Sequence, residues 1–452
     1  MAGWARDAVF YHIYPLGLCG APKRNDFTSA PEPRLAELHD WIPHLRELGV
    51  TALYLGPLFE STEHGYDTAD YYRVDRRLGD EATLAGVVAA MHAAGIRVIL
   101  DGVFHHVGRD FWAFRDLQAN GPASRFRDWF AGVDFGRRSP YGDAFAYDAW
   151  RGHHNLVKLN LRNPEVREHL FGAVSAWVRE FGIDGLRLDV AEDIEVDFLR
   201  DLAAHCRGLA PDFWLLGEAI HGDYRRLANP GTLHSATNYE LYKGLYSSHN
   251  DRNYFEAAHS LQRQFGDGGM YAELALYTFA DNHDVDRVAT TLREPGHLYP
   301  LHALLFTVPG IPSIYYGSEW GIAGARTGGS DDLLRPRLRP SDAAHAPRPE
   351  LAGWIARLAR IRRESRALRH GAYRQLHVAS EQLAFARVLQ DETVVVAVNA
   401  ASTPAVLDLQ VTAPEGGSFV DLLDPGHHIT ARAGRLRIDA VPARGARILA
   451  LR

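Results

Sequence analysis

Val98-Ile99-Leu100-Asp101 is an apolar run that ends in a carboxylate, and the same pattern recurs three times further along the chain. The other runs are Leu186-Arg187-Leu188-Asp189, Trp214-Leu215-Leu216-Gly217-Glu218 and Tyr277-Thr278-Phe279-Ala280-Asp281-Asn282-His283-Asp284. Continuous apolar runs of this length are typical of strands that are buried on both faces of a parallel sheet. Because the C-terminal strand ends of a β/α barrel carry its reacting groups, we expect these carboxylates to converge on one site.

A glycine separates a helical run from an apolar run at three places, Gly49, Gly95 and Gly182. Glycine tolerates the left-handed conformation that ends many helices, so this repeated joint indicates an alternating α/β fold. The apolar runs predict about eight strands, near residues 9–14, 51–55, 96–101, 184–189, 213–217, 232–238, 274–279 and 312–316. Eight such strands joined by helices predict a (β/α)8 TIM barrel.

The chain of 452 residues is longer than one barrel usually needs. Residues 107–160, between the third strand and the next helix, are rich in aromatic residues, glycine and aspartate, and predict a small inserted lobe over the barrel mouth. Short strands separated by turn residues near the C-terminus predict an antiparallel β-sandwich. The predicted division is a catalytic barrel at 1–106 and 161–368, a lobe (domain B) at 107–160 and a C-terminal domain at 369–452.

Composition excludes several function classes. The net charge of −7 offers no basic surface for nucleic acid, and no apolar run is long enough to predict a membrane helix. The N-terminus lacks an apolar leader, so we expect a cytoplasmic protein. Cys19 and Cys206 are expected to be reduced thiols. His105-His106 and His153-His154 lack the spacing of a zinc site, and no phosphate-binding or dinucleotide-binding motif is present, so no cofactor or metal is predicted.

The carboxylate-bearing runs resemble the four conserved segments of the α-amylase family of glycoside hydrolases, in the family's order. Asp101-Gly102-Val103-Phe104-His105-His106 is similar to the first segment, 185–191 to the second, Gly217-Glu218 to the third and 279–284 to the fourth. The resemblance implies a retaining mechanism, with Asp189 as the nucleophile and Glu218 as the general acid and then base. It also implies that Asp284 holds sugar hydroxyls and stabilises the oxocarbenium-like transition state.

Arg187 lies two residues before Asp189 and therefore shares its strand face, where a fixed cation is expected to keep Asp189 ionised. The resemblance implies further substrate-binding residues on the loops that follow neighbouring strands. His106 and His283 would bind sugar hydroxyls, and Asp101 would support this shell from beneath. Tyr66 would stack on a sugar ring. Asp67 would orient either its own loop or Arg187.

Val157-Lys158-Leu159-Asn160 resembles a segment of the cyclomaltodextrinase, neopullulanase and maltogenic amylase group, which favours short or cyclic α-glucans. Because the first predicted strand starts at once, we expect no counterpart of the N-terminal β-domain that helps those enzymes to dimerise, so a homodimer is possible but its mode is open. The predicted domain organisation also resembles that of the cyclic maltosyl-maltose hydrolases of that group. His105 occupies the position of an asparagine whose oxygen binds Ca²⁺ in many α-amylases, which predicts that this calcium site is lost.

The leading prediction is a retaining hydrolase of α-1,4-glucosidic bonds in short or cyclic maltooligosaccharides, with a small α-glucan as its partner. A transglycosylase or isomerase of the same family, similar to trehalose synthase or α-glucosidase, is the first alternative. A non-catalytic sugar-binding barrel is the second, because a fold does not fix a function. Aromatic residues of the lobe are predicted to wall a narrow pocket: Phe111, Trp112, Trp129 and Trp150.

Overall fold

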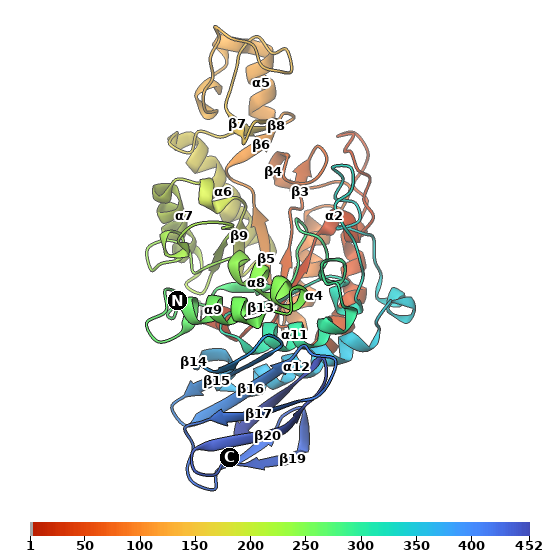
Figure 1. Ribbon diagram of the computed structural model, residues 1–452. Helices are drawn as coiled ribbons and strands as arrows, with labels where there is room; N and C mark the ends of the chain where they lie inside the picture. Colours follow the sequence, from red (N-terminus) through yellow and green to blue (C-terminus); the bar gives the residue numbers. More distant parts are fainter. Residues whose placement is uncertain (1–2) are drawn as a thin grey trace.

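An eight-stranded parallel sheet forms the centre of the structure, a computed structural model that describes residues 3–452 (Figure 1). Its strand order is β11-β10-β9-β5-β2-β1-β13-β12. A parallel bridge between Thr237 and Tyr277 joins the two outer strands, so the sheet closes into the predicted barrel. The strands are β1 (Phe10–Ile13), β2 (Ala52–Leu55), β5 (Arg97–Gly102), β9 (Gly185–Leu188), β10 (Trp214–Gly217), β11 (Ser235–Ala236), β12 (Tyr277–Phe279) and β13 (Ile311–Tyr315).

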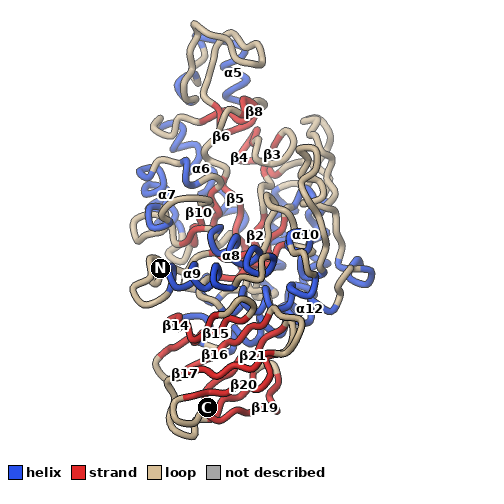
Figure 2. Tube along the Cα trace, in the orientation of Figure 1, coloured by secondary structure: helices blue, strands red, loops and turns tan. Residues whose placement is uncertain are grey.

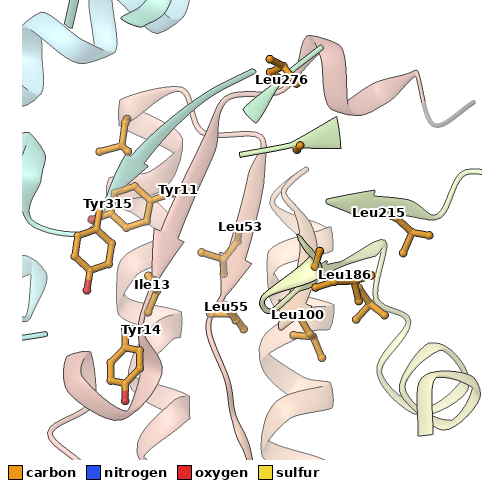
Figure 3. Close-up of a cluster of buried hydrophobic side chains, with 14 of the residues drawn as sticks. Tyr11, Ile13, Tyr14, Leu53, Leu55, Leu100, Leu186, Leu215, Leu276 and Tyr315 are labelled. Atoms are coloured by element: carbon orange, nitrogen blue, oxygen red, sulfur yellow. The ribbon is translucent and has the colours of Figure 1, made fainter. Parts of the chain in front are cut away.

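The barrel strands β1, β2, β5, β10 and β13 each contribute to two apolar cores, because successive side chains point to opposite faces. Tyr54 and Ile99 belong to a cluster made mostly of residues from the barrel strands, which fills the barrel interior. Leu53 and Leu100 belong instead to the large cluster that includes the helix residue Leu84 (Figure 3). The strands are therefore buried on both faces, which is why their sequences are continuously apolar.

Helices surround the barrel as expected for this fold (Figure 2). Gly49, Gly95 and Gly182 have φ values of 79°, 77° and 70° and follow helices at the predicted joints. The connection between β10 and β11 departs from the regular pattern, since among the described residues it holds only the short 3-10 helix η5 (Tyr224–Arg226). The main helices are α3 (Ile42–Leu48), α4 (Glu81–Ala93), α6 (Pro164–Phe181), α7 (Val196–Leu209), α8 (Tyr239–Asn250), α9 (Tyr254–Phe265), α11 (Leu298–Thr307) and α12 (Glu350–Glu364).

Short elements complete the barrel domain. The loop after β2 contains the antiparallel pair β3 (Phe59–Ser61) and β4 (Thr68–Val74). The loop after β9 contains the 3-10 helix η4 (Ala191–Asp193). The remaining short helices are α1 (Trp4–Asp7), α2 (Pro15–Leu18), α10 (Val288–Thr291), α13 (Arg366–His370), η1 (Arg34–Trp41), η6 (Pro295–His297), η7 (Ser318–Trp320) and η8 (Pro340–His345).

The inserted lobe follows β5 and projects from the end of the barrel opposite the C-terminal strands (Figure 1). Its antiparallel sheet has the order β6-β8-β7, formed by β6 (His106–Gly108), β8 (His153–Lys158) and β7 (Ala149–Trp150). Helix α5 (Trp112–Asn120) and the 3-10 helices η2 (Gly121–Ala123) and η3 (Arg127–Trp129) lie between β6 and β7. Since His106 pairs with Lys158 across this sheet, the lobe begins directly at the barrel mouth.

The C-terminal strands form a six-stranded antiparallel sheet, of order β14-β15-β16-β21-β18-β19, and a two-stranded sheet of β17 and β20 (Figure 2). Buried residues of both sheets, such as Val395 and Ile438, share one apolar cluster, which confirms the predicted sandwich. The strands are β14 (Ala372–Val378), β15 (Gln382–Leu389), β16 (Glu392–Asn399), β17 (Ala405–Gln410), β18 (Ser418–Asp421), β19 (Asp424–Thr430), β20 (Arg435–Val441) and β21 (Gly445–Leu451).

Within residues 3–452, none of the helices combines the length and the apolar character that crossing a membrane would require. We keep the division into 1–106 with 161–368, 107–160 and 369–452 as a proposal for the domain boundaries.

Candidate active site

Three of the predicted carboxylates meet around one buried guanidinium, that of Arg187, which is 3% exposed. Its Nη1 donates to Asp101 and to Asp189, at 2.9 Å each, and its Nη2 lies 2.9 Å from Oε1 of Glu218. These residues belong to the C-terminal ends of β5, β9 and β10, which are neighbours in the barrel. Pairing of Asp101 with Arg187 in register explains why residues so far apart in sequence come together.

A strained backbone follows Asp189. Val190 has a φ of 41°, a left-handed conformation that a β-branched residue rarely adopts. In this conformation its N–H donates to Oε2 of Glu218 at 2.9 Å. The strain therefore coincides with a contact that fixes the carboxylate of Glu218 beside Asp189.

Asp284 has two partners of its own. His283 Nε2 lies 2.9 Å from its Oδ2, and Nη2 of Arg335 lies 3.1 Å from its Oδ1. The Nε of Arg335 also donates to the carbonyl of His283 at 3.0 Å, so one guanidinium holds two consecutive residues. Burial disfavours the charged form of Asp284, but His283 and Arg335 outweigh it and hold the pKa well below its usual range.

The shared guanidinium has a clear electrostatic consequence for Asp189 and Glu218. Burial raises the pKa of Glu218, and Arg187 offsets only part of this effect because three carboxylates share one cation. Burial also raises the pKa of Asp189 well above its usual value against the opposing effect of Arg187, so the expectation that Arg187 keeps Asp189 ionised is not met. A proton retained by this pair leaves one carboxylate and one carboxylic acid, the two forms that a nucleophile and a general acid require.

Asp101 lies beneath the reacting groups with its side chain fully buried. The hydroxyl of Tyr54 donates to its Oδ2 at 2.7 Å, and the hydroxyl of Tyr66 donates to the same oxygen at 3.2 Å. Tyr66 also hydrogen-bonds to Nε2 of His283, and the two rings stack with centroids 5.4 Å apart. Asp101 therefore connects the Arg187 cluster with the Asp284 cluster.

A pocket of about 580 Å³ opens above these groups. Five of the predicted residues line it, whereas four others do not belong to its lining in the described structure: Asp67, Asp101, Arg187 and His283. The five that line it are Tyr66, His106, Asp189, Glu218 and Asp284.

His106 presents a free ring nitrogen at this pocket. Its Nε2 is 3.8 Å from Oδ2 of Asp189 and has no hydrogen-bond partner among the described residues. Burial lowers the pKa of His106 well below its usual value, so the ring is neutral. A neutral, buried and unpartnered nitrogen is suited to a ligand hydroxyl.

Asp67 contacts its own loop rather than Arg187. Its carboxylate accepts hydrogen bonds from the backbone N–H groups of Glu63, His64 and Gly65 at 2.8, 3.1 and 3.2 Å. These bonds hold the segment that carries Tyr66, which is the first of the two roles expected for Asp67.

The prediction that four aromatic residues of the lobe wall the pocket is correct for only one of them. Of the four lobe residues, Trp150 lines the pocket, whereas Phe111, Trp112 and Trp129 are absent from its lining in the described structure. Trp112 packs edge-on against Trp129, with centroids 5.5 Å apart, and Phe111 is 1% exposed. Phe111 and Trp129 are buried in the large apolar cluster, and Trp112 is 38% exposed, a difference that aromatic content alone could not reveal.

Sequence reasoning missed two residues of the site, Tyr54 and Arg335. Tyr54 lies within an apolar strand, where an aromatic side chain suggests only core packing, although it faces Asp101. Arg335 belongs to an irregular loop between β13 and α12 and lies 4.6 Å above the ring of Tyr14. No periodicity or motif places such a loop residue in space.

Comparison with known proteins assigns the family. The catalytic domain model of α-amylase matches residues 34–339, and the model described as "Neopullulanase-like, C-terminal domain" matches residues 373–445. The chain belongs to the α-amylase family of glycoside hydrolases. The family assignment confirms that this protein is an enzyme of that class.

Similarity to two of the relatives extends over nearly the whole chain. Neopullulanase 2 of Thermoactinomyces vulgaris is 33% identical over 474 residues, covering 98% of this chain and 77% of the relative. A cyclomaltodextrinase of Geobacillus thermopakistaniensis (strain MAS1) is 32% identical over 464 residues, covering 97% and 76%. The ligand-free structure of cyclic α-maltosyl-(1→6)-maltose hydrolase from Arthrobacter globiformis superposes with a TM-score of 0.82 at 27% identity, covering 99% of this chain and 98% of that chain.

The residues around His105 do not fit the calcium site of many α-amylases. His105 presents ring nitrogens where an amide oxygen is needed, and its Nδ1 lies 3.2 Å from Nδ1 of His106. Burial lowers the pKa of His105 to about 4, so the ring is neutral. Within residues 3–452, no group of three or more His, Cys, Asp or Glu side chains is arranged to hold a metal ion.

We therefore expect hydrolytic activity to survive exhaustive chelation. After dialysis against EDTA, kcat/KM for maltotriose should stay within about twofold of its starting value, because no oxygen ligand replaces the asparagine at His105. The assay compares chelated enzyme with and without added Ca²⁺. Activity that is lost on chelation and restored by Ca²⁺ would show that a calcium site exists elsewhere in the chain.

Proposed function

We propose that this enzyme hydrolyses α-1,4-glucosidic bonds of short or cyclic maltooligosaccharides with retention of the anomeric configuration. The observation that carries the proposal is the placement of Asp189 and Glu218 on the two terminal nitrogens of Arg187, at the floor of a pocket. Retaining glycosidases need a nucleophile and an acid/base group about 5 Å apart, and one guanidinium holds two carboxylates at close range.

In the first step, Asp189 attacks the anomeric carbon while Glu218 gives its proton to the glycosidic oxygen. The bond between that carbon and oxygen breaks, the shortened sugar leaves with the proton, and a glycosyl ester forms on Asp189. In the second step, Glu218 takes a proton from water, which attacks the same carbon and releases Asp189. Asp284 and the free nitrogen of His106 bind hydroxyls of the sugar that reacts.

The names of the relatives support the substrate class, since they are called cyclomaltodextrinase, neopullulanase and cyclic α-maltosyl-(1→6)-maltose hydrolase. The experiment that tests the proposal is a chromatogram of products from maltotetraose, β-cyclodextrin, pullulan and trehalose. Glucose and maltose from the first two substrates support hydrolysis, and the initial anomer of the product tests retention. Trehalose or lengthened chains would support an isomerase or a transglycosylase instead, and no turnover would support a sugar-binding barrel.

We expect short substrates to be preferred over polymer. Trp150 of the lobe and Arg335 of the loop before α12 both line the pocket, so a long chain has to pass these side chains. The value of kcat/KM per glucose unit should therefore be at least about tenfold lower for soluble starch than for maltotetraose. Equal or higher values for starch would indicate an open cleft and an endo-acting α-amylase.

The homodimer and the cytoplasmic location stay predictions. Gel filtration combined with light scattering measures the first, and cell fractionation measures the second.

A further inference from the structure

An unusual turn joins the strands β7 and β8 of the lobe, where Trp150 pairs with His153. The two central residues, Arg151 and Gly152, have φ values of 46° and 84°. Two-residue hairpin turns of this kind favour asparagine, aspartate or glycine, because other side chains strain the left-handed backbone. An arginine at a turn position that favours asparagine, aspartate or glycine indicates that its side chain makes a functional contact.

The side chain of Arg151 reaches from the lobe to the barrel. Its Nη2 lies 2.9 Å from Glu192 and its Nε lies 3.5 Å from Asp193, both in the 3-10 helix η4. The ring N–H of Trp150 donates to the same Asp193 at 3.2 Å. We call Arg151, Glu192 and Asp193 the clasp.

Glu192 extends the clasp to a third segment. Its second oxygen, Oε2, accepts hydrogen bonds from the backbone N–H groups of Ile220 and His221 at 2.9 and 3.1 Å. This segment begins two residues after Glu218, at the end of β10. The clasp therefore ties the lobe to both loops that carry the paired carboxylates.

The clasp contributes to the part of the pocket lining that follows β9 and β10. Arg151, Glu192 and Ile220 all contribute to the pocket lining. Because the proposed acid Glu218 is held by the same loops, this is the side on which the leaving sugar departs.

Trp150 is held as a flat wall on this side. Its ring stacks between His106 and His153, with centroids 5.8 and 5.5 Å away and interplanar angles of 28° and 26°. The guanidinium of Arg151 also lies over this ring, 5.4 Å from its centroid, so loss of Arg151 would loosen the wall.

We propose that Arg151 determines substrate specificity by closing the leaving-group side of the pocket, so that only a short leaving chain fits. This inference rests on the proposed hydrolysis of α-glucans and assigns its length preference to the clasp. It makes Arg151 a positioning residue, which acts through the lobe and the wall formed by Trp150.

The test uses Arg151→Asn, which removes the guanidinium but supplies a residue that the turn prefers. The melting temperature should not fall, because the backbone strain is relieved. The ratio of kcat/KM for soluble starch to kcat/KM for maltotetraose should rise about fivefold, through a lower KM for starch. A ratio that stays within about twofold of the wild-type ratio overturns the proposal.

A second variant, Glu192→Gln, breaks the ion pair from the other side and keeps an amide oxygen for the two backbone N–H groups. It should shift the ratio in the same direction, which keeps the proposal testable if Arg151→Asn misfolds. Arg127→Asn is the matched control, since Arg127 also belongs to the lobe and is 53% exposed against 49% for Arg151. Its ratio should equal that of the wild type.

Hydrogen exchange measures the clasp without any substrate. Amides of residues 149–156 should exchange several-fold faster in Arg151→Asn than in the wild type, and should be unchanged in Arg127→Asn. Unchanged exchange in Arg151→Asn would contradict the claim that the clasp holds the turn of the lobe in place. If the wild type hydrolyses no α-glucan but exchange rises as expected, the proposed function fails and the clasp stands.

Discussion

The Asp189→Asn variant is expected to lose hydrolysis of maltotriose by at least about 10⁴-fold in kcat, because an amide cannot form the glycosyl ester. The substitution changes almost no volume, and Arg187 keeps Asp101 and Glu218 as partners. Three carboxylates share the single positive charge of Arg187, so the fold should tolerate the loss of the carboxylate of Asp189. We therefore expect a melting temperature within a few degrees of the wild type, and binding of maltotriose within about threefold of the wild type as measured by calorimetry.

Asp223→Asn is the control for this variant, because Asp223 follows the same barrel strand as Glu218 but pairs with exposed Arg225. Its kcat should stay near the wild-type value. Activity of Asp189→Asn within tenfold of the wild type would remove Asp189 from the role of nucleophile. A large loss of melting temperature would instead show that the charge of Asp189 is needed for folding.

The barrel could be predicted because backbone geometry repeats along the chain. Each strand is buried on both faces, so it appears as a continuous apolar run, and Gly49, Gly95 and Gly182 mark the helix ends that precede strands. Parallel register then brings strand ends together, which explains why Asp101 lies beside Arg187. The local sequence pattern and the regularity of the barrel are therefore sufficient to predict where these residues lie.

Other parts of the site depend on long-range contacts that have no local pattern. Arg335 reaches Asp284 from an irregular loop, and nothing in its neighbours indicates that reach. The strain at Val190 and at Arg151 is likewise invisible in the sequence, because it coincides with long-range contacts to Glu218 and Glu192. Such residues are stabilised by tertiary contacts against their local preference, which is common at functional sites.

The Glu218→Gln variant is expected to separate the two steps of catalysis. Hydrolysis of maltotriose should fall about 10²–10⁴-fold in kcat/KM, because its sugar leaving group needs a proton. An aryl maltoside with a good leaving group departs without protonation, so its kcat/KM should stay within about tenfold of the wild type. The comparison of both substrates, each assayed in the wild type and in the variant, measures the role of Glu218.

The pH dependence gives this variant its sharpest test. Burial raises the pKa of Glu218 in the wild type, so its protonated form persists to higher pH and activity falls as pH rises through that pKa. Glutamine does not titrate, so the variant should lose this alkaline limb in kcat/KM. Loss of activity by the same factor on both substrates, with the limb retained, would contradict the assignment. In that outcome the proton would have to come from water or from Asp189, the other carboxylate of the pocket lining that pairs with Arg187.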